Sequence, residues 1–204
     1  MPPTLLVLAG GAGTRLMPAV NDRPKALAEI ASQPMLRHQL FCWSRQGIRD
    51  VVLVTGVMGD QIETFINRDF LEDSKTLSMN ISMIREISPL GTGGAILNAI
   101  TELRIEERVM VTNADTWLSS GMRDLAFSPQ DTVGVIEMNR PDRYGTVELN
   151  DSKVVAFKEK TLGIIRGYIN AGVYSLHPHI FRKFSSGTAF SLENDVLPEL
   201  VREG

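Results

Sequence analysis

TLLVLAGGAGTRL, residues 4–16, runs from a short apolar segment directly into a glycine-rich turn. Residues 4–9 are mostly apolar, which predicts a strand that is buried on both faces, as in a parallel sheet. The glycines at positions 10, 11 and 13 let the backbone turn sharply and can point N–H groups at an anion. We therefore predict an α/β fold with an anion site where this strand ends.

The side chains beside the glycines favour a phosphate as that anion. Thr14 adds a hydroxyl donor, and the forked guanidinium of Arg15 matches phosphate oxygens. The tripeptide Arg23-Pro24-Lys25 supplies another cation, and Pro24 stiffens the backbone that carries Lys25. Glycines alone would fit a plain strand-to-helix turn equally well, whereas these donors favour phosphate binding.

Two well-known phosphate loops do not fit the sequence. The dinucleotide-binding fingerprint requires a glycine at position 16, where the chain has Leu16. The P-loop requires Gly-Lys-Ser or Gly-Lys-Thr, which the chain lacks. A dinucleotide-dependent oxidoreductase is therefore disfavoured, and tight binding of NAD would revive it.

Strand and helix patterns alternate through the first half of the chain. In order, the predicted strands are 4–9, 50–55, 80–85 and 108–112, and the predicted helices are 34–46, 60–67 and 93–103. This alternation predicts βαβ units and a Rossmann-like, doubly wound sheet.

The pattern changes after residue 130. Strand patterns follow at 132–138, 146–149, 154–158 and 168–175, with a hairpin turn at 150–153 and a closing helix at 191–201. Because little helix lies between these strands, we predict a mixed sheet with an antiparallel extension. Ser191 is the predicted N-cap of the closing helix, with Glu193 and Asp195 as acidic helix-start residues.

Composition narrows the possible partners. The chain has 204 residues, 43% of them hydrophobic, and a formal net charge of −3. It can bury a core, and it has no general positive field for nucleic acid or a membrane surface. The one cysteine excludes an intramolecular disulfide. The N-terminus lacks the basic region of a signal peptide, so we expect a cytoplasmic protein.

The glycine-rich loop, together with residues 23–27, closely resembles the signature of the sugar-1-phosphate nucleotidyltransferases. Six further segments match that family in the same order along the chain. They are PLGTGGA at 89–95, NAD at 113–115, DRYGTV at 142–147, FKEK at 157–160, NAGVY at 170–174 and SLENDVLP at 191–198. The resemblance implies one domain over 1–204 with the nucleotide-diphospho-sugar transferase type of fold. Residues 1–130 would bind the nucleotide and residues 131–204 the sugar phosphate.

The resemblance also implies roles for individual residues. The nucleotide-binding residues would be Leu8, Gly10, Gly11, Gly13, Thr14, Gly93, Gly94 and Asn113. Arg15, Lys25 and Asp115 would be catalytic, and Asp115 would also hold Mg²⁺. Gly145, Glu159, Lys160 and Asn170 would contact the sugar phosphate.

Plainer interpretations of three of these segments remain open. Asp115 follows a predicted strand, where ligands gather in open α/β sheets, but aspartate is also common in turns. Residues 89–95 would let a flat base lie against the backbone, or they would only start a helix. Glu159 and Lys160 would serve equally as a surface charge pair.

The implied reaction joins a nucleoside triphosphate to a sugar 1-phosphate and releases pyrophosphate. The acceptor needs no activated side chain, because a phosphate monoester has a second pKa of about 6 and is largely dianionic at neutral pH. The pair DRYGTV and SLENDV most resembles the D-glycero-D-manno-heptose 1-phosphate guanylyltransferases, which implies GTP and that heptose phosphate as substrates. Uridylyl, cytidylyl or thymidylyl transfer to a hexose 1-phosphate stays open, as does a weakly active, nucleotide-binding regulatory relative.

Two further expectations follow from the family. Its members commonly continue into a segment with a second metal-binding aspartate, which this chain does not include. Either the chain is shortened, or Asp115, phosphates and water alone hold the metal. Assembly into a homo-oligomer also stays open.

Overall fold

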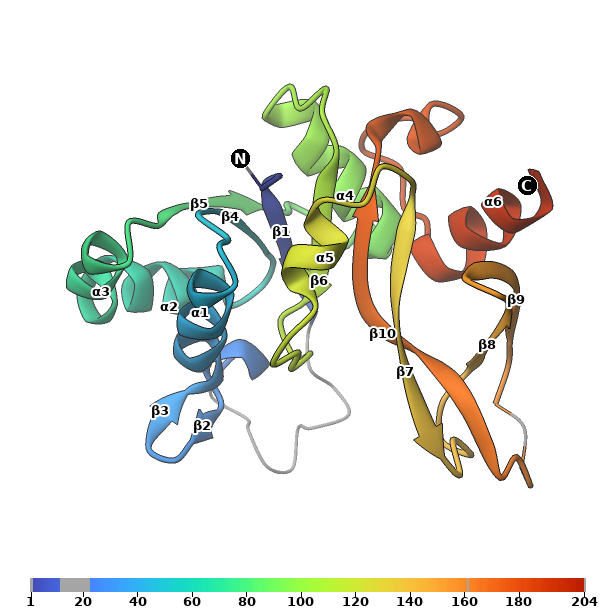
Figure 1. Cartoon of the computed structure of the whole chain (residues 1–204). Helices are drawn as coiled ribbons and strands as arrows, with labels where there is room; N and C mark the ends of the chain where they lie inside the picture. The colour runs from blue at the N-terminus through green and yellow to red at the C-terminus, as the bar shows by residue number, and fades with distance from the viewer. Residues whose placement is uncertain (1, 12–22, 161, 204) are drawn as a thin grey trace.

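The structure of the chain is a computed structural model that describes residues 2–11, 23–160 and 162–203 (Figure 1). Four strands of the first half pair in parallel and form one side of the central sheet. In sheet order they are β5 (Asn80–Arg85), β4 (Asp50–Thr55), β1 (Leu5–Ala9) and β6 (Val109–Asn113). The predicted strands are confirmed, and each observed end lies within one residue of the predicted end.

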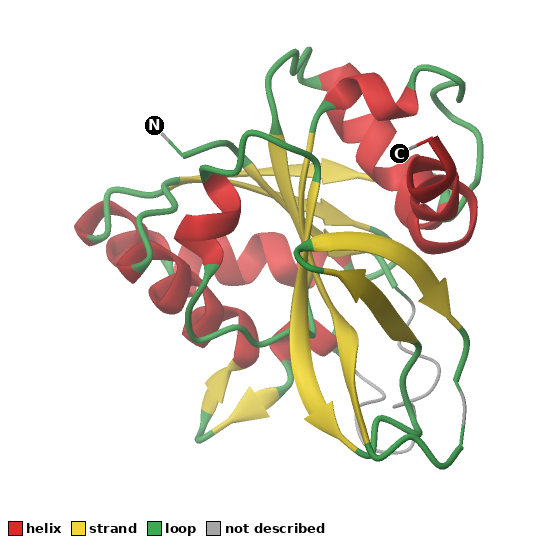
Figure 2. Cartoon of the chain, turned by 45° about the vertical axis from the view of Figure 1, so that its right-hand side comes forward, coloured by secondary structure: helices red, strands yellow, loops and turns green. Residues whose placement is uncertain are grey.

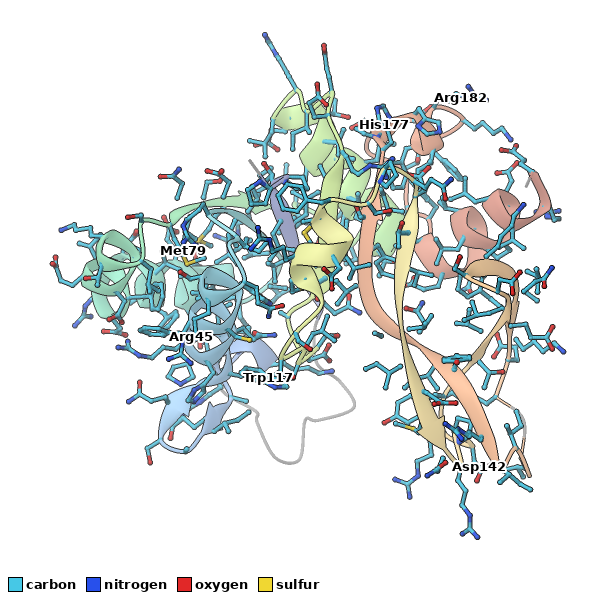
Figure 3. The ribbon with its side chains drawn as sticks, viewed as in Figure 1. Arg45, Met79, Trp117, Asp142, His177 and Arg182 are labelled. Atoms are coloured by element: carbon cyan, nitrogen blue, oxygen red, sulfur yellow. The ribbon has the colours of Figure 1, made fainter. Side chains whose placement is uncertain are left out.

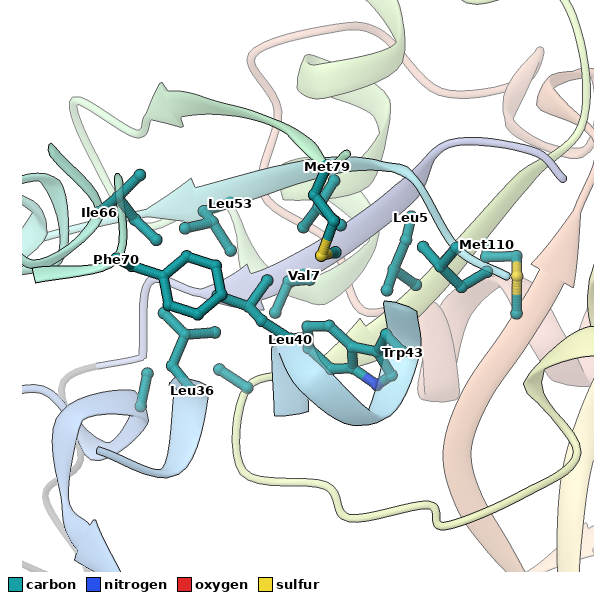
Figure 4. Close-up of a cluster of buried hydrophobic side chains, with 14 of the residues drawn as sticks. Leu5, Val7, Leu36, Leu40, Trp43, Leu53, Ile66, Phe70, Met79 and Met110 are labelled. Atoms are coloured by element: carbon teal, nitrogen blue, oxygen red, sulfur yellow. The ribbon is translucent and has the colours of Figure 1, made fainter. Parts of the chain in front are cut away.

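Helices cover both faces of this sheet (Figure 2). Successive strand residues point to opposite faces, so Leu5 and Val7 pack with α1 (Met35–Arg45), while Leu6 packs with α4 (Gly91–Glu102). The first of these clusters also contains Trp43 and Phe70 (Figure 4). The other helices divide in the same way: α2 (Gly59–Thr64) and α5 (Met122–Ala126) join the first cluster and α6 (Leu197–Glu203) the second. The predicted doubly wound sheet is confirmed.

The second half of the chain adds antiparallel strands. They are β7 (Thr132–Asn139), β8 (Thr146–Asn150), β9 (Lys153–Lys158) and β10 (Arg166–Leu176). β10 runs antiparallel to β6, β7 and β8, and β8 pairs with β9 across the predicted hairpin turn. Asp151 adopts a left-handed φ of 55° in that turn. The mixed sheet is therefore also confirmed.

β6 and β8 pair with different parts of the same edge of β10, and a gap lies between the two pairings. Residues 173–176 pair with β6, and residues 168–169 pair with β8, while β7 occupies the other edge. Residues 170–172 lie between these two pairings, and Gly172 has a φ of 68° there. We call this place the sheet split. It brings the carboxyl end of β6 near the start of β8.

Several short elements differ from the prediction. Pro34, predicted in the first turn of a helix, instead ends the hairpin of β2 (Glu29–Ile30) and β3 (Gln33–Pro34) and precedes α1. α2 covers only the first part of the predicted helix 60–67. The chain then continues as a π-helical turn, η3 (Phe65–Asp69), and as α3 (Leu71–Thr76). The closing helix begins as a π-helical turn η5 (Leu192–Val196). Elements of two to six residues are too short to show a hydrophobic period, which explains why they escaped prediction.

Within the described ranges, no helix has both the length and the apolar character needed to span a bilayer.

Candidate functional site

The predicted nucleotide and sugar residues that the structure describes lie toward one end of the molecule. β1 and β6 end there, and the first half of the antiparallel β10 extends past the same edge. Figure 3 shows Trp117, two residues after Asp115, and Asp142 toward this end, while His177 and Arg182 lie at the opposite end. The sheet therefore brings together segments that are far apart in the sequence.

Lys25 and Asp115 form an ion pair at this end. Lys25 opens a 3-10 turn, η2 (Lys25–Leu27), directly after the extended residue Pro24. Its Nζ lies 3.3 Å from Oδ2 of Asp115, with side chains 29% and 50% exposed. Asp115 itself sits in a turn in which the amide of Thr116 donates to the carbonyl of Asn113. The Asp115 side chain accepts a hydrogen bond from Lys25 and, among the described residues, none from its own turn, which favours a functional over a turn-forming aspartate.

Only the beginning of the glycine-rich loop lies within the described residues. Gly10 packs against the backbone that follows β4, because a Cβ on Gly56 would lie 2.6 Å from the Gly10 carbonyl oxygen. Leu8 is partly buried and packs against the second core cluster. The predicted positions Gly13, Thr14 and Arg15 lie outside the described residues. Their roles stay predictions.

The predicted base-binding glycines are part of α4. This helix begins at Gly91, two residues before the start of the predicted helix 93–103, so Gly93 and Gly94 lie in its first turn. The amides of both glycines donate to the Phe190 carbonyl, at 3.0 and 3.3 Å. A Cβ on Gly93 would overlap the Phe190 ring, and a Cβ on Gly94 would overlap the Thr188 carbonyl oxygen. The chain's own residues therefore fill the space beside these glycines, and their contact with a base stays a prediction.

Gly94→Ala should destabilise the protein. Because the atom in the way belongs to the backbone of Thr188, the added methyl group must displace a chain segment, at a cost of about 1–3 kcal/mol. For a chain of this size, Tm should fall by about 2–10 °C in a thermal melt. Gly167→Ala is the matched control, since its Cβ would meet its nearest atom at an ordinary 3.5 Å. Equal melting temperatures for the two variants would contradict this account.

The predicted sugar residues lie around the sheet split. A Cβ on Gly145 would lie 2.9 Å from the Lys158 carbonyl oxygen, so a glycine lets these backbones approach closely. Glu159 and Lys160 follow the end of β9 and are exposed. Asn170 lies in the split itself, in β10.

The amide of Asn170 is held on both sides. Its Nδ2 donates to Oη of Tyr174, and its Oδ1 accepts from the Gly172 amide, both at 2.8 Å. A Cβ on Gly172 would lie 3.2 Å from Nδ2 of Asn113. Asn113, a predicted nucleotide residue, therefore lies beside the glycine whose amide binds Asn170, a predicted sugar residue. Tyr174 is buried, and burial, followed by the nearby Glu193 carboxylate, raises the pKa of its hydroxyl. This hydroxyl stays protonated and holds the Asn170 side chain.

Two acidic residues at the start of the closing helix have different hydrogen-bond partners. Ser191 and Asp195 cap the helix: Ser191 Oγ accepts from the Asn194 amide, and Asp195 Oδ2 accepts from the Ser191 amide. Glu193 Oε2 instead accepts from the Thr92 hydroxyl at 2.6 Å. The helix-start position is confirmed for both acidic residues, which lie in the first turn, and Glu193 also ties this helix to the first turn of α4.

Glu86 is a candidate functional residue that no sequence motif indicated. It directly follows β5, and its carboxylate reaches the place where Gly10 has no side chain. Burial raises the pKa of this carboxyl group, and a hydrogen bond from the Leu90 amide partly opposes that effect. A half-buried carboxylate beside the glycine-rich loop is typical of a functional site.

Asp115 is the carboxylate at this end of the sheet that the sequence predicts as a metal ligand. Among the described residues, no group of three or more His, Cys, Asp or Glu side chains could hold a metal ion. The half-exposed Asp115 carboxylate suits Mg²⁺, which commonly takes one or two protein carboxylates and completes its shell with phosphate oxygens and water. Asp115 therefore fits the expected role as a metal ligand.

Comparison with known proteins gives consistent matches over nearly the whole chain. The model of the family described as Nucleotidyl transferase matches residues 4–204. D-glycero-alpha-D-manno-heptose 1-phosphate guanylyltransferase of Aneurinibacillus thermoaerophilus is 37% identical over 94% of this chain and 82% of that enzyme. Mannose-1-phosphate guanyltransferase beta-B of Xenopus laevis is 30% identical over 98% of this chain, which spans 56% of that protein.

A solved structure shows the same architecture. HddC from Yersinia pseudotuberculosis, in complex with GMP-PN, superposes with a TM-score of 0.81 and 28% identity. The match covers 98% of this chain and 86% of that structure. The predicted fold type is confirmed.

Proposed function

Because this chain belongs to the nucleotidyl transferase family, we propose that it transfers the guanylyl group of GTP to D-glycero-D-manno-heptose 1-phosphate. The products are the GDP-heptose and pyrophosphate. The observation that carries the proposal is the Lys25–Asp115 pair, with its 3.3 Å contact, beside the sheet split. The identity of 37% to a heptose 1-phosphate guanylyltransferase supports this choice of substrates.

The reaction needs positioned charge more than an activated nucleophile. An oxygen of the sugar phosphate forms a bond to the α-phosphorus of GTP, and the α–β bridging bond breaks, with its electron pair leaving on pyrophosphate. The barrier arises because two polyanions must be brought together. Fixed cations lower this barrier by positioning the substrates and by electrostatic stabilisation. Lys25 supplies such a cation at the edge of the sheet. Arg15 and Lys160 are proposed as further cations, for the triphosphate and the sugar phosphate.

We propose Mg²⁺ as the cofactor. Asp115 would hold it together with phosphate oxygens and water, as the chemistry of a single exposed carboxylate allows. When bound, the ion would offset negative charge on the triphosphate and on the leaving pyrophosphate.

A substrate panel tests the proposal. Pyrophosphate release is measured for GTP, UTP, CTP and dTTP, each crossed with heptose and hexose 1-phosphates, with and without Mg²⁺. We expect the fastest release from GTP with the heptose phosphate, and only when both the sugar phosphate and Mg²⁺ are present. Faster release from a pyrimidine nucleotide would support the alternative substrates. Nucleotide binding without any release would support a regulatory relative.

Tyr174→Phe should weaken binding of the sugar phosphate. The variant loses the 2.8 Å hydrogen bond that holds Asn170, so KM for the sugar phosphate should rise about 3–10-fold, with KM for GTP unchanged. Steady-state kinetics with each substrate varied in turn measure the two constants. Tyr168→Phe, an exposed tyrosine of the same strand, is the control. An equal rise in both KM values would point to a general loss of structure instead.

A further inference from the structure

Gln39 is a polar residue on the buried face of α1. Its side chain is 1% exposed, and Leu36 and Leu40 beside it belong to the first core cluster. Its Nε2 donates to the carbonyl of Thr116 at 2.7 Å. Because a carbonyl only accepts hydrogen bonds, this contact also determines which end of the amide is Nε2. Gln39 therefore connects α1 to the loop that carries Asp115.

The other end of the Gln39 amide has no partner within the described part of the chain. Its Oε1 is buried, and no hydrogen bond reaches it there. A buried acceptor without a partner destabilises a fold at least as much as one hydrogen bond stabilises it. A methionine of similar length would fill the same space without this cost. The stability of the core therefore gives no reason for a glutamine at this position, and its contact with Thr116 is the feature that explains it.

Gln46, two helical turns further along the same face, makes a different kind of contact. Both ends of its amide are paired: Nε2 donates to the Leu118 carbonyl at 3.2 Å, and Oε1 accepts from the Met122 amide at 3.0 Å. The thiol of Cys42, which lies between the two glutamines, donates to the same Leu118 carbonyl at 3.5 Å. These contacts anchor the loop from Leu118 onward, and Gln39 holds its start.

The backbone of Thr116, the residue directly after Asp115, is held at both of its polar groups. Its amide donates to the carbonyl of Asn113 at 3.1 Å, and its carbonyl accepts from Gln39. The chain that leaves Asp115 therefore has a fixed direction. Two side-chain torsions of Asp115 then place its carboxylate beside Lys25.

We infer that Gln39 is a positioning residue for nucleotidyl transfer: by holding the Thr116 carbonyl, it keeps the Asp115 carboxylate oriented toward the metal ion and the phosphates. The inference rests on the proposed function, because it needs Asp115 to act on a bound substrate. Residues behind a metal ligand commonly set the orientation of that ligand, and their loss costs about 10–100-fold in metal affinity or activity. Because Gln39 is buried, its effect on the substrates passes through Asp115.

Gln39→Met tests the inference. The variant keeps the length of the side chain but has no donor, so kcat for pyrophosphate release should fall about 10–100-fold and the Mg²⁺ dependence should shift to higher concentration. KM for the sugar phosphate should stay unchanged. Because the variant also loses the unpaired Oε1, its Tm should differ from that of the wild type by less than about 4 °C. Ser44→Ala, which removes a buried hydroxyl of α1 that accepts from Arg49, is the control and should keep the wild-type kcat.

A second readout does not depend on activity. The Thr116 carbonyl and the Trp117 amide belong to the same peptide group, so the NMR order parameter of that amide reports how firmly Gln39 holds it. Although Trp117 is 51% exposed, we expect an order parameter of about 0.85 in the wild type, which is typical of rigid backbone. In Gln39→Met it should fall toward about 0.6, the upper limit for a flexible segment. The amide of Met122, which Gln46 holds, should be unchanged.

The outcomes distinguish this inference from the proposed function. Near wild-type turnover in Gln39→Met overturns the role of Gln39 while the transferase activity stands. A loss of turnover together with a large fall in Tm overturns it as well, because that result indicates a general structural role. If the variant fails to fold, the wild-type order parameter decides, and a flexible Trp117 amide overturns the inference. If the wild type releases no pyrophosphate from any nucleoside triphosphate with any sugar phosphate, the proposed function itself fails.

Discussion

Lys25→Ala should lower kcat for nucleotidyl transfer by about 10²–10⁴-fold, which is the cost of losing one well-placed electrostatic group. The ammonium group of Lys25 lies at the carboxyl end of β6, 3.3 Å from Asp115, where the triphosphate and the sugar phosphate are proposed to meet. Without this cation, two polyanions must approach each other with less compensation of their charge. The loss should therefore appear in turnover more than in stability.

The stability of the variant provides an internal check. Exposed ion pairs are worth about 0–1 kcal/mol, so removal of the Lys25–Asp115 pair should lower Tm by no more than a few degrees. Kinetics at saturating GTP and sugar phosphate, together with a thermal melt, measure both quantities. Lys75→Ala, which removes an exposed lysine that pairs with Glu72 on α3, is the control. Near wild-type turnover in Lys25→Ala would refute the assignment of Lys25.

Much of the fold could be predicted because its strands are short apolar runs bounded by turns. The ranges 50–55 and 80–85 were predicted without error. The first is a nearly continuous apolar run, typical of a strand buried in a parallel sheet, and the second, at the edge of the sheet, alternates polar and apolar residues. The β2–β3 hairpin left no such signal. Its two turn residues, Ala31 and Ser32, adopt left-handed φ angles of 50° and 62° without a glycine to indicate them.

Residues of the candidate site could be predicted only where they belong to a motif that resembles the family. Lys25 and Asp115 were both identified by resemblance, yet their ion pair joins residues 90 positions apart and depends on the order of the strands. Glu86 belongs to no recognised motif, and it becomes a candidate only because the sheet places the end of β5 near Gly10. Sequence likewise did not reveal that Phe190 fills the space beside Gly93, because a glycine reports a close approach but not its partner.

Asp115→Asn should lower turnover at a fixed Mg²⁺ concentration by about 10²–10³-fold and shift the Mg²⁺ dependence to higher concentration. The amide has nearly the same size as the carboxylate but carries no charge, so it is a poorer ligand for a hard cation. The change also leaves the Lys25 ammonium group without its carboxylate partner. We therefore expect GTP to bind the variant without Mg²⁺ at least as tightly as it binds the wild type.

The effect on Mg²⁺-dependent turnover and the effect on GTP binding without Mg²⁺ have opposite signs. This difference distinguishes the loss of a metal ligand from a general disruption of the site. A Mg²⁺ titration of pyrophosphate release measures the first effect, and calorimetric titration with GTP in the presence of a chelator measures the second. Asp124→Asn, an exposed aspartate on α5, should leave both unchanged. A disrupted site would weaken GTP binding and turnover together. An unaltered Mg²⁺ titration in Asp115→Asn would show that Asp115 does not hold the ion, because the loss of a ligand's charge must lower the affinity for the metal that it binds.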